Sequence, residues 1–160
     1  MLIRRANDTD RVAIWQMLEP VVRAGETYAL PRDMAGADAI AYWLNPDHQT
    51  FVALLDGTAA GTYYLRANQQ GGGAHVANCG YITDGRFARR GLAEAMCRDS
   101  MERAKQQGFT AMQFNCVVSS NIHAIDLCSR LGFATVGRLP RAFAHPRAGL
   151  IDALVMFREL

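Results

Sequence analysis

Residues 88–93 read Ala-Arg-Arg-Gly-Leu-Ala; they follow a strand-like run, His75 to Thr83, and open a helix-like run, Leu92 to Gln107. A short glycine-containing turn that feeds a helix leaves several backbone N–H groups without partners, at the positive end of the helix dipole. Arg89 and Arg90 add positive charge that suits a phosphate. The stretch therefore predicts a site for a phosphate-bearing ligand where this helix begins.

The composition is that of one globular domain. The chain has 160 residues, of which 50% are apolar and 20% charged, so residues 1–160 can form a single domain with a proper core. The net charge is only +2 and the basic residues form no long run, so we expect neither nucleic acid nor a membrane surface as a partner. The first residues lack the apolar core of a signal peptide, and no apolar run reaches the roughly 18 residues that a membrane span needs.

The four cysteines are widely spaced and contain no C-x-x-C pair. This spacing matches no common zinc pattern, so no metal is expected, and it gives no disulfide framework. A reducing cytoplasm is therefore the expected location.

Hydrophobic periodicity and turn residues predict alternating strands and helices around the 88–93 stretch. The predicted strands are 2–6, 50–55, 59–68, 75–83, 110–118, 133–138 and 150–157, and the predicted helices are 12–25, 35–44, 92–107 and 122–131. Asp56-Gly57 predicts a tight hairpin, and Pro20 predicts a kink or break in the first helix. Residues 139–149, with two prolines, are predicted to form a long connection. Three antiparallel strands that lead into a β-α-β crossover make the sheet mixed.

This order of elements resembles the GNAT superfamily of acyl-CoA-dependent N-acyltransferases, and two motifs carry the resemblance. The family's pyrophosphate loop, Gln/Arg-x-x-Gly-x-Gly/Ala, matches residues 88–93, except that Ala88 replaces the usual Gln or Arg. The family's Asn-x-x-Ala-x-x-Leu-Tyr-x-x-x-Gly-Phe motif matches residues 121–133, except that Cys128 replaces the tyrosine. Within the superfamily, the chain resembles the branch that includes the phosphinothricin-type and amino-acid N-acetyltransferases.

The resemblance implies an α/β fold (α+β in some schemes) with a mixed, mostly antiparallel sheet of about seven strands. A splayed central pair of strands and about four flanking helices complete the expected fold. The implied activity is the transfer of an acetyl group from acetyl-CoA to a primary amine of a small, amino-acid-like molecule, by direct attack in a ternary complex. The resemblance also allows a homodimer.

The expected cofactor-binding residues follow from the two motifs. Backbone N–H groups from Arg89 to Glu94 would hold the diphosphate of CoA, with Gly91 and Ala93 kept small so that the ligand can approach. By resemblance, the end of the 75–83 strand pairs with the pantetheine arm as an added strand. The complete expected set is Tyr81, Ile82, Thr83, Arg89, Arg90, Gly91, Leu92, Ala93, Glu94 and Asn121. Asn121 is alternatively only a helix N-cap.

The catalytic residues are less clearly marked. By resemblance, Cys128 stands where a tyrosine protonates the leaving CoA thiolate. Its alternative role is that of a buried, inert side chain, with water or another group as the proton donor. The N–H of Ile82 is the expected oxyanion donor. Glu26 is the first candidate for a general base, and the other candidates are His75, His145, Asp152 and ordered water.

The expected acceptor pocket lies between the loop that begins at Glu26 and the 139–149 connection. Glu26, Tyr28 and Asn78 are its candidate binding residues, with Asn115 as a second polar lining. The arginines that could pair with an acceptor carboxylate are Arg32, Arg141 and Arg147, whereas Trp15, Trp43 and Phe114 are expected in the core.

Three other functions are weighed against this one. A non-catalytic acyl-CoA-binding regulatory domain fits the departures at Ala88 and Cys128. An acetyltransferase acting on a protein N-terminus or a lysine uses the same motifs. An ATP-binding protein is disfavoured because no Lys-Ser/Thr follows the glycine of the loop.

Overall fold

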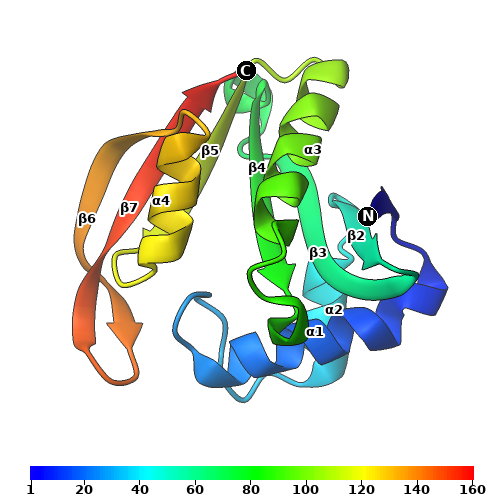
Figure 1. The fold of residues 1–160 in the computed structure, drawn as a ribbon. Coiled ribbons are helices and arrows are strands. Elements are labelled where there is room, and N and C mark those ends of the chain that lie inside the picture. The colour runs from blue at the N-terminus through cyan, green and yellow to red at the C-terminus, as the bar shows by residue number, and fades with distance from the viewer.

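A seven-stranded sheet with helices on both faces forms the fold, as seen in a computed structural model that describes all 160 residues (Figure 1). The strands are β1 (Leu2–Arg5), β2 (Gln49–Leu55), β3 (Thr58–Ala67), β4 (Val76–Thr83), β5 (Ala111–Val118), β6 (Ala134–His145) and β7 (Gly149–Glu159). The helices are α1 (Arg11–Ala24), α2 (Gly36–Trp43), α3 (Leu92–Gln106) and α4 (Ile122–Arg130). The predicted mixed sheet and its helices are confirmed. None of these helices combines the length and the apolar character that a membrane crossing requires.

The sheet has the strand order β1-β2-β3-β4-β5-β7-β6. Every neighbouring pair is antiparallel except β4 and β5, which are parallel. This parallel pair is joined by the crossover through α3, as a parallel connection requires. It lies at the centre of the sheet and divides the molecule into two halves.

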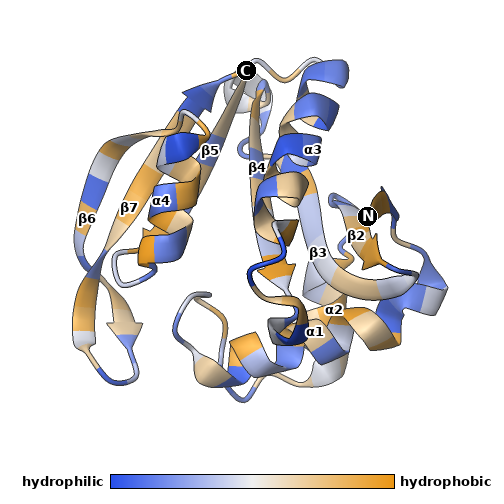
Figure 2. Cartoon of the chain, viewed as in Figure 1, coloured by the Kyte–Doolittle hydropathy of each residue, from blue (hydrophilic) through white to orange (hydrophobic).

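Two apolar cores cover the two faces of the sheet. The larger core packs α3 and α4 on one face, and Met96, Met112 and Met156 are fully buried in it. The smaller core packs α1 and α2 on the other face around Ile14 and Trp43. Figure 2 shows apolar and hydrophilic residues mixed along each of these helices.

A short 3-10 turn with a capping box, Asp8–Asp10, precedes helix α1, which continues through its proline. The Asn7 side chain accepts from the Thr9 N–H, and Asp10 accepts from the Asn7 N–H at 2.8 Å. Of the kink or break predicted at Pro20, the break does not occur, because one helix runs from Arg11 to Ala24. Pro20 is exposed while its neighbours Met17, Leu18 and Val22 are buried. The packing of this apolar face therefore holds the helix together across the missing hydrogen bond.

The hairpin predicted at Asp56-Gly57 is confirmed. Both residues adopt positive φ, 51° for Asp56 and 81° for Gly57, as a type I′ turn requires.

Of the three aromatic residues expected in the core, Trp43 and Phe114 are buried. Trp15 is only half-buried, and its ring lies 5.6 Å from the Arg23 guanidinium.

The long connection predicted at 139–149 is wrong, because β6 extends to His145 and only residues 146–148 form the turn to β7. Pro140 is tolerated because β6 is an edge strand, whose outer N–H groups need no partner. The ladder skips residues between Leu139 and Phe143, and Arg141 adopts φ 54° in this bulge. The Asp152 carboxylate accepts from the Arg141 N–H at 2.9 Å and so satisfies the bulged backbone.

Candidate active site

The parallel strands β4 and β5 pair at one end only. Val76 pairs with Ala111 and Ala77 with Met112, and beyond these residues the two strands separate. Figure 1 shows them close together near the C-terminus and far apart at the opposite end. The Asn78 side chain donates to the Gln113 carbonyl at 2.9 Å, immediately beyond the last ladder pair. This bond closes the vertex of the gap between the strands.

A cavity of about 550 Å³ lies in this gap and reaches both faces of the sheet. On the face of α1 and α2 it is lined by aromatic side chains, those of Tyr28, Tyr42 and Tyr64. On the face of α3 and α4 it is lined by small and apolar residues, among them Ala93, Cys97, Leu127 and Cys128. Two molecules can therefore meet between the strands, one from each face.

The edge of β4 that faces the gap carries unpaired backbone groups. The Val76 carbonyl accepts from Asn68 and the Asp84 N–H donates to Ala60, so the even-numbered residues between them face β3. The odd-numbered residues Cys79, Tyr81 and Thr83 therefore present their N–H and C=O groups to the gap.

This register corrects the expectation that the Ile82 N–H holds an oxyanion. Ile82 lies opposite Thr62 in an uninterrupted antiparallel ladder, so its N–H points to β3. The neighbouring N–H that faces the gap is that of Tyr81. Its carbonyl accepts a 3.0 Å hydrogen bond from the Tyr28 hydroxyl, which fixes the loop after α1 against β4.

The start of α3 forms a concave run of free N–H groups. Arg89 and Gly91 adopt left-handed φ values of 62° and 76°, whereas Arg90 between them does not. Such alternation turns successive N–H groups toward one point and makes an anion-binding nest. None of the N–H groups from Arg89 to Glu94 has a hydrogen-bond partner in the protein, and no side chain caps the helix.

The space above this nest is open. A Cβ at Gly91 would meet no atom within 4 Å, so the glycine is required by its positive φ and not by crowding within the protein. Arg89 and Arg90 are exposed and take part in no ion pair, and Figure 2 shows the segment leading into α3 as hydrophilic. Glu94 binds Arg98 at 2.8 Å and Arg130 at 3.6 Å, so its carboxylate is held away from the nest.

Asn121 both caps α4 and lines the cavity. Its side-chain oxygen accepts from the Ala124 N–H at 3.3 Å, which is the role of an N-cap. Its side-chain amide N–H groups have no partner in the protein and remain available to a ligand.

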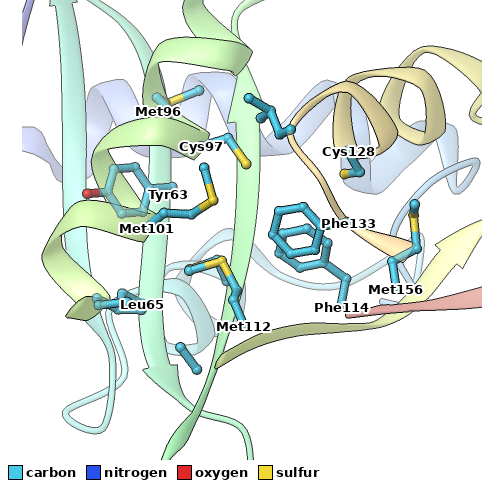
Figure 3. Close-up of a cluster of buried hydrophobic side chains, with 14 of the residues drawn as sticks. Tyr63, Leu65, Met96, Cys97, Met101, Met112, Phe114, Cys128, Phe133 and Met156 are labelled. Atoms are coloured by element: carbon cyan, nitrogen blue, oxygen red, sulfur yellow. The ribbon is translucent and has the colours of Figure 1, made fainter. Parts of the chain in front are cut away.

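Cys128 lines the cavity but is buried in the larger core. Figure 3 shows it on α4 beside Phe133, Phe114 and Met156. Desolvation by burial raises the pKa of the Cys128 thiol to about 11. A thiol with this pKa is a weaker acid than an ordinary thiol, whose pKa is about 8.5.

Of the candidate bases, Glu26 is the one that lines a cavity beside the gap. Glu26 forms a 2.6 Å ion pair with Arg147 of the β6–β7 turn and lines a smaller cavity of about 330 Å³. This smaller cavity shares Val21, Thr27 and Thr83 with the main one.

The other base candidates line neither cavity. His75 lies in the turn before β4, His145 accepts from the N–H groups of its own hairpin turn, and Asp152 binds Arg138 and the Arg141 N–H.

The three arginines expected to bind an acceptor carboxylate do not line the main cavity. Arg32 donates to the Arg23 carbonyl at 2.9 Å, Arg141 lies in the bulge of β6, and Arg147 binds Glu26. The cavity is instead lined by Arg66 at the end of β3, which no sequence motif marks as a site residue. The alternation of side chains along a strand predicts the face of the sheet on which Arg66 lies. It does not predict whether the side chain at that position lines a cavity or the outer surface.

The comparisons with known proteins identify the class. The sequence model of the Acetyltransferase (GNAT) family matches residues 12–133, more than half of the chain, and the chain belongs to this family. The predicted resemblance to the superfamily is thereby confirmed.

Individual relatives agree with the family assignment. A GCN5-related N-acetyltransferase structure from Kribbella flavida is 37% identical, with a TM-score of 0.95 over 99% of this chain and 97% of that one. The N-acetyltransferase aca1 of Schizosaccharomyces pombe is 29% identical over 96 residues, which are 59% of this chain and 46% of that protein, so the match spans about half of its length. A phosphinothricin acetyltransferase from Sinorhizobium meliloti in complex with acetyl-CoA has a TM-score of 0.86 at 18% identity, over 99% of this chain and 88% of that one. This last likeness is one of fold.

Proposed function

We propose that this protein transfers an acetyl group from acetyl-CoA to a primary amine of a small, amino-acid-like molecule. The observation that carries the proposal is the run of free N–H groups from Arg89 to Glu94 next to the unpaired edge of β4. A diphosphate fits the first feature and an amide-containing arm fits the second. CoA contains both groups, because its amide-containing pantetheine arm is attached directly to the diphosphate.

Each part of acetyl-CoA has a place in this arrangement. The diphosphate lies in the nest of Arg89 to Gly91 and on the N–H groups of Leu92, Ala93 and Glu94, with Arg90 near a phosphate. The pantetheine arm pairs with the gap-facing backbone of Thr83, so that the thioester lies at the Tyr81 N–H, while Asn121 donates its free amide N–H groups from α4. The register supports this placement because only the odd-numbered residues of β4 turn their backbone N–H and C=O groups toward the gap.

The reaction takes place between the two faces of the sheet. The amine nitrogen attacks the thioester carbon, the carbonyl oxygen takes up negative charge, and the Tyr81 N–H stabilises it. The C–S bond then breaks, the acetyl group remains on the nitrogen, and CoA leaves as the thiolate. The amine's proton passes through water to Glu26, the carboxylate of the adjoining cavity that has no backbone partner.

Cys128 serves as a packing residue in this proposal. Its pKa of about 11 makes proton transfer to a CoA thiolate unfavourable, since that thiolate belongs to an ordinary thiol with a pKa of about 8.5. Water that enters the gap returns the proton to the thiolate instead.

The proposal extends to the protein's location and assembly. All four cysteines are free, which is compatible with the proposed reducing cytoplasm. A homodimer stays a prediction from the family resemblance.

Two measurements on the purified protein test the function. Isothermal titration with acetyl-CoA measures binding, and a thiol reagent measures CoA release with a panel of amines. Binding together with amine-dependent thiol release supports an acetyltransferase. Binding with a silent panel of small amines, protein N-terminal peptides and lysine peptides would favour the regulatory acyl-CoA-binding domain and contradict the proposal.

A further inference from the structure

Arg66 is the only Asp, Glu, Lys or Arg side chain that lines the main cavity. Its even position on β3 places it on the same face as Tyr64, the face of α1 and α2. The cavity at this face has aromatic walls and no carboxylate. A cation that faces an otherwise uncharged cavity favours an anionic group in whatever ligand enters it.

The Arg66 guanidinium is oriented by its neighbours but is not neutralised by them. Its Nε donates to the Asn78 side-chain oxygen at 3.3 Å, and its central carbon lies 6.0 Å from the Tyr64 ring centre. Neither of its terminal nitrogens has a hydrogen-bond or ion-pair partner in the protein. Two parallel terminal N–H groups are the arrangement that binds a carboxylate in a bidentate manner.

The position of Arg66 in the sheet separates this site from that of the cofactor. Arg66 pairs across the strands with Asn78, at the vertex of the gap, whereas the nest at Arg89 to Gly91 precedes α3 on the other face. The cation-π contact turns the guanidinium back along β3 toward Tyr64, whose cross-strand partner is Gly80. An acceptor held by Arg66 therefore lies beside the part of β4 where the thioester is proposed to sit.

We infer that Arg66 determines acceptor specificity by binding a carboxylate of the acceptor, so that amines with a carboxylate are accepted and polycationic amines are not. The inference rests on the proposed function for the identity of the site. Tyr28, Tyr42 and Tyr64 form the apolar wall against which the rest of the acceptor packs. Asn78 is a positioning residue, because it acts on the acceptor only by orienting Arg66.

The test compares acceptors that differ only in the carboxylate. Phenylalanine, its amide and 2-phenylethylamine form one set, and methionine and alanine with the corresponding amides and decarboxylated amines form two more. Binding of each compound is measured calorimetrically in the presence of CoA, for the wild type, Arg66→Gln and Arg66→Lys. Arg11→Gln, an exposed arginine in the first turn of α1, is the matched control.

The wild type should bind at least one amino acid about tenfold or more tightly than its amide, as a charge-assisted bidentate pair provides. Arg66→Gln should abolish this preference, Arg66→Lys should keep part of it, and Arg11→Gln should keep all of it. Acetyl-CoA affinity should change less than about twofold in every variant. The inference is overturned if no amino acid binds better than its amide, or if Arg66→Gln retains the preference.

Thiol release, followed in the same samples, separates the two proposals. Carboxylate-dependent binding without any thiol release would overturn the proposed function and leave the role of Arg66 standing. Thiol release that is equally fast with acids, amides and decarboxylated amines would support the proposed function and overturn the role of Arg66.

Discussion

The Asn78 side chain and the Gln113 carbonyl are joined by a 2.9 Å hydrogen bond across the point where β4 and β5 separate. The two strands share only two ladder pairs before this bond. Asn78 is buried, and its other side-chain atom accepts from Arg66. One carboxamide therefore closes the vertex of the cavity and orients the charged group inside it.

Asn78→Ala should weaken both the vertex and the acceptor site. The Gln113 carbonyl and the Arg66 Nε each lose a partner, so the free energy of unfolding should fall by about 1–3 kcal/mol. The KM for a carboxylate acceptor should rise, while acetyl-CoA affinity changes less than about threefold, since its proposed contacts lie elsewhere. Denaturant unfolding and calorimetry check the two effects. An unchanged free energy of unfolding would show that this hydrogen bond does not stabilise the vertex between β4 and β5.

Gly91→Glu should abolish CoA binding with a limited loss of stability. The new side chain carries negative charge into the nest and faces open space, so it obstructs a ligand and not the protein. Gly57→Glu is the matched control, because Gly57 also has positive φ and an open environment but lies in the β2–β3 turn. Both variants should lose similar thermal stability, and only Gly91→Glu should lose CoA affinity. Equal affinity in the two would contradict the assignment of the diphosphate site.

Cys128→Ala should reduce kcat by no more than about threefold. The Cys128 thiol, with a pKa of about 11, keeps its proton and does not transfer it to the more weakly basic CoA thiolate. Cys97→Ala, which removes another buried thiol of the same core, is the comparison. Both should cost about 1 kcal/mol of stability. A rate loss above about a hundredfold in Cys128→Ala alone would make this thiol the proton donor.

Glu26→Gln should lower kcat/KM by about a hundredfold at neutral pH, the scale of a lost general base. The loss should shrink as the pH rises, because the acceptor amine then arrives without its proton. Arg147→Gln removes the ion-pair partner but keeps the carboxylate, so it should retain most of the activity. The pH profiles of the three proteins provide the measurement. A Glu26→Gln loss that is the same at all pH values would argue for a structural role.

Asp10→Asn should destabilise the fold in a pH-dependent manner. The hydrogen bonds from Arg4, at 2.7 and 2.8 Å, together with that from the Asn7 N–H, lower the pKa of the Asp10 carboxyl below 3.8. A lowered folded-state pKa contributes stability above the unfolded value and loses it as the pH falls. The difference between wild type and variant should be about 1–3 kcal/mol at pH 7. It should narrow below about pH 4, and unfolding curves at several pH values that show a constant difference would refute this.

The local structure around residues 88–93 could be predicted because it depends on residues close together in the chain. Gly91 and the helix that begins at Leu92 follow from turn chemistry and periodicity within a few residues of sequence. The hairpin at Asp56-Gly57 is of the same kind. By contrast, Pro20 and Pro140 signal breaks that do not occur, because the packing of α1 and the edge position of β6 outweigh the local preference.

The acceptor side could not be predicted in the same way. Arg32, Arg141 and Arg147 are arginines of the expected loops, yet each is directed to a backbone carbonyl, a bulge or Glu26. In the sequence, Arg66 is a charged residue at the end of a strand with no distinguishing neighbour. In the folded protein, its contacts with Asn78 and Tyr64 orient its side chain in the cavity. Such contacts join residues from different strands, and no local pattern records them.

The sequence by itself determined the family, the order of strands and helices, and the free N–H groups at the start of α3, since each depends on residues that are near one another in the chain. Only the tertiary structure decided which backbone groups of β4 face the gap, because that depends on the register with β3. It also decided that Cys128 is buried and that Arg66 lies in the cavity. Burial and register depend on contacts between segments that are far apart in the sequence, and the packing free energy of the whole fold decides which of these contacts form.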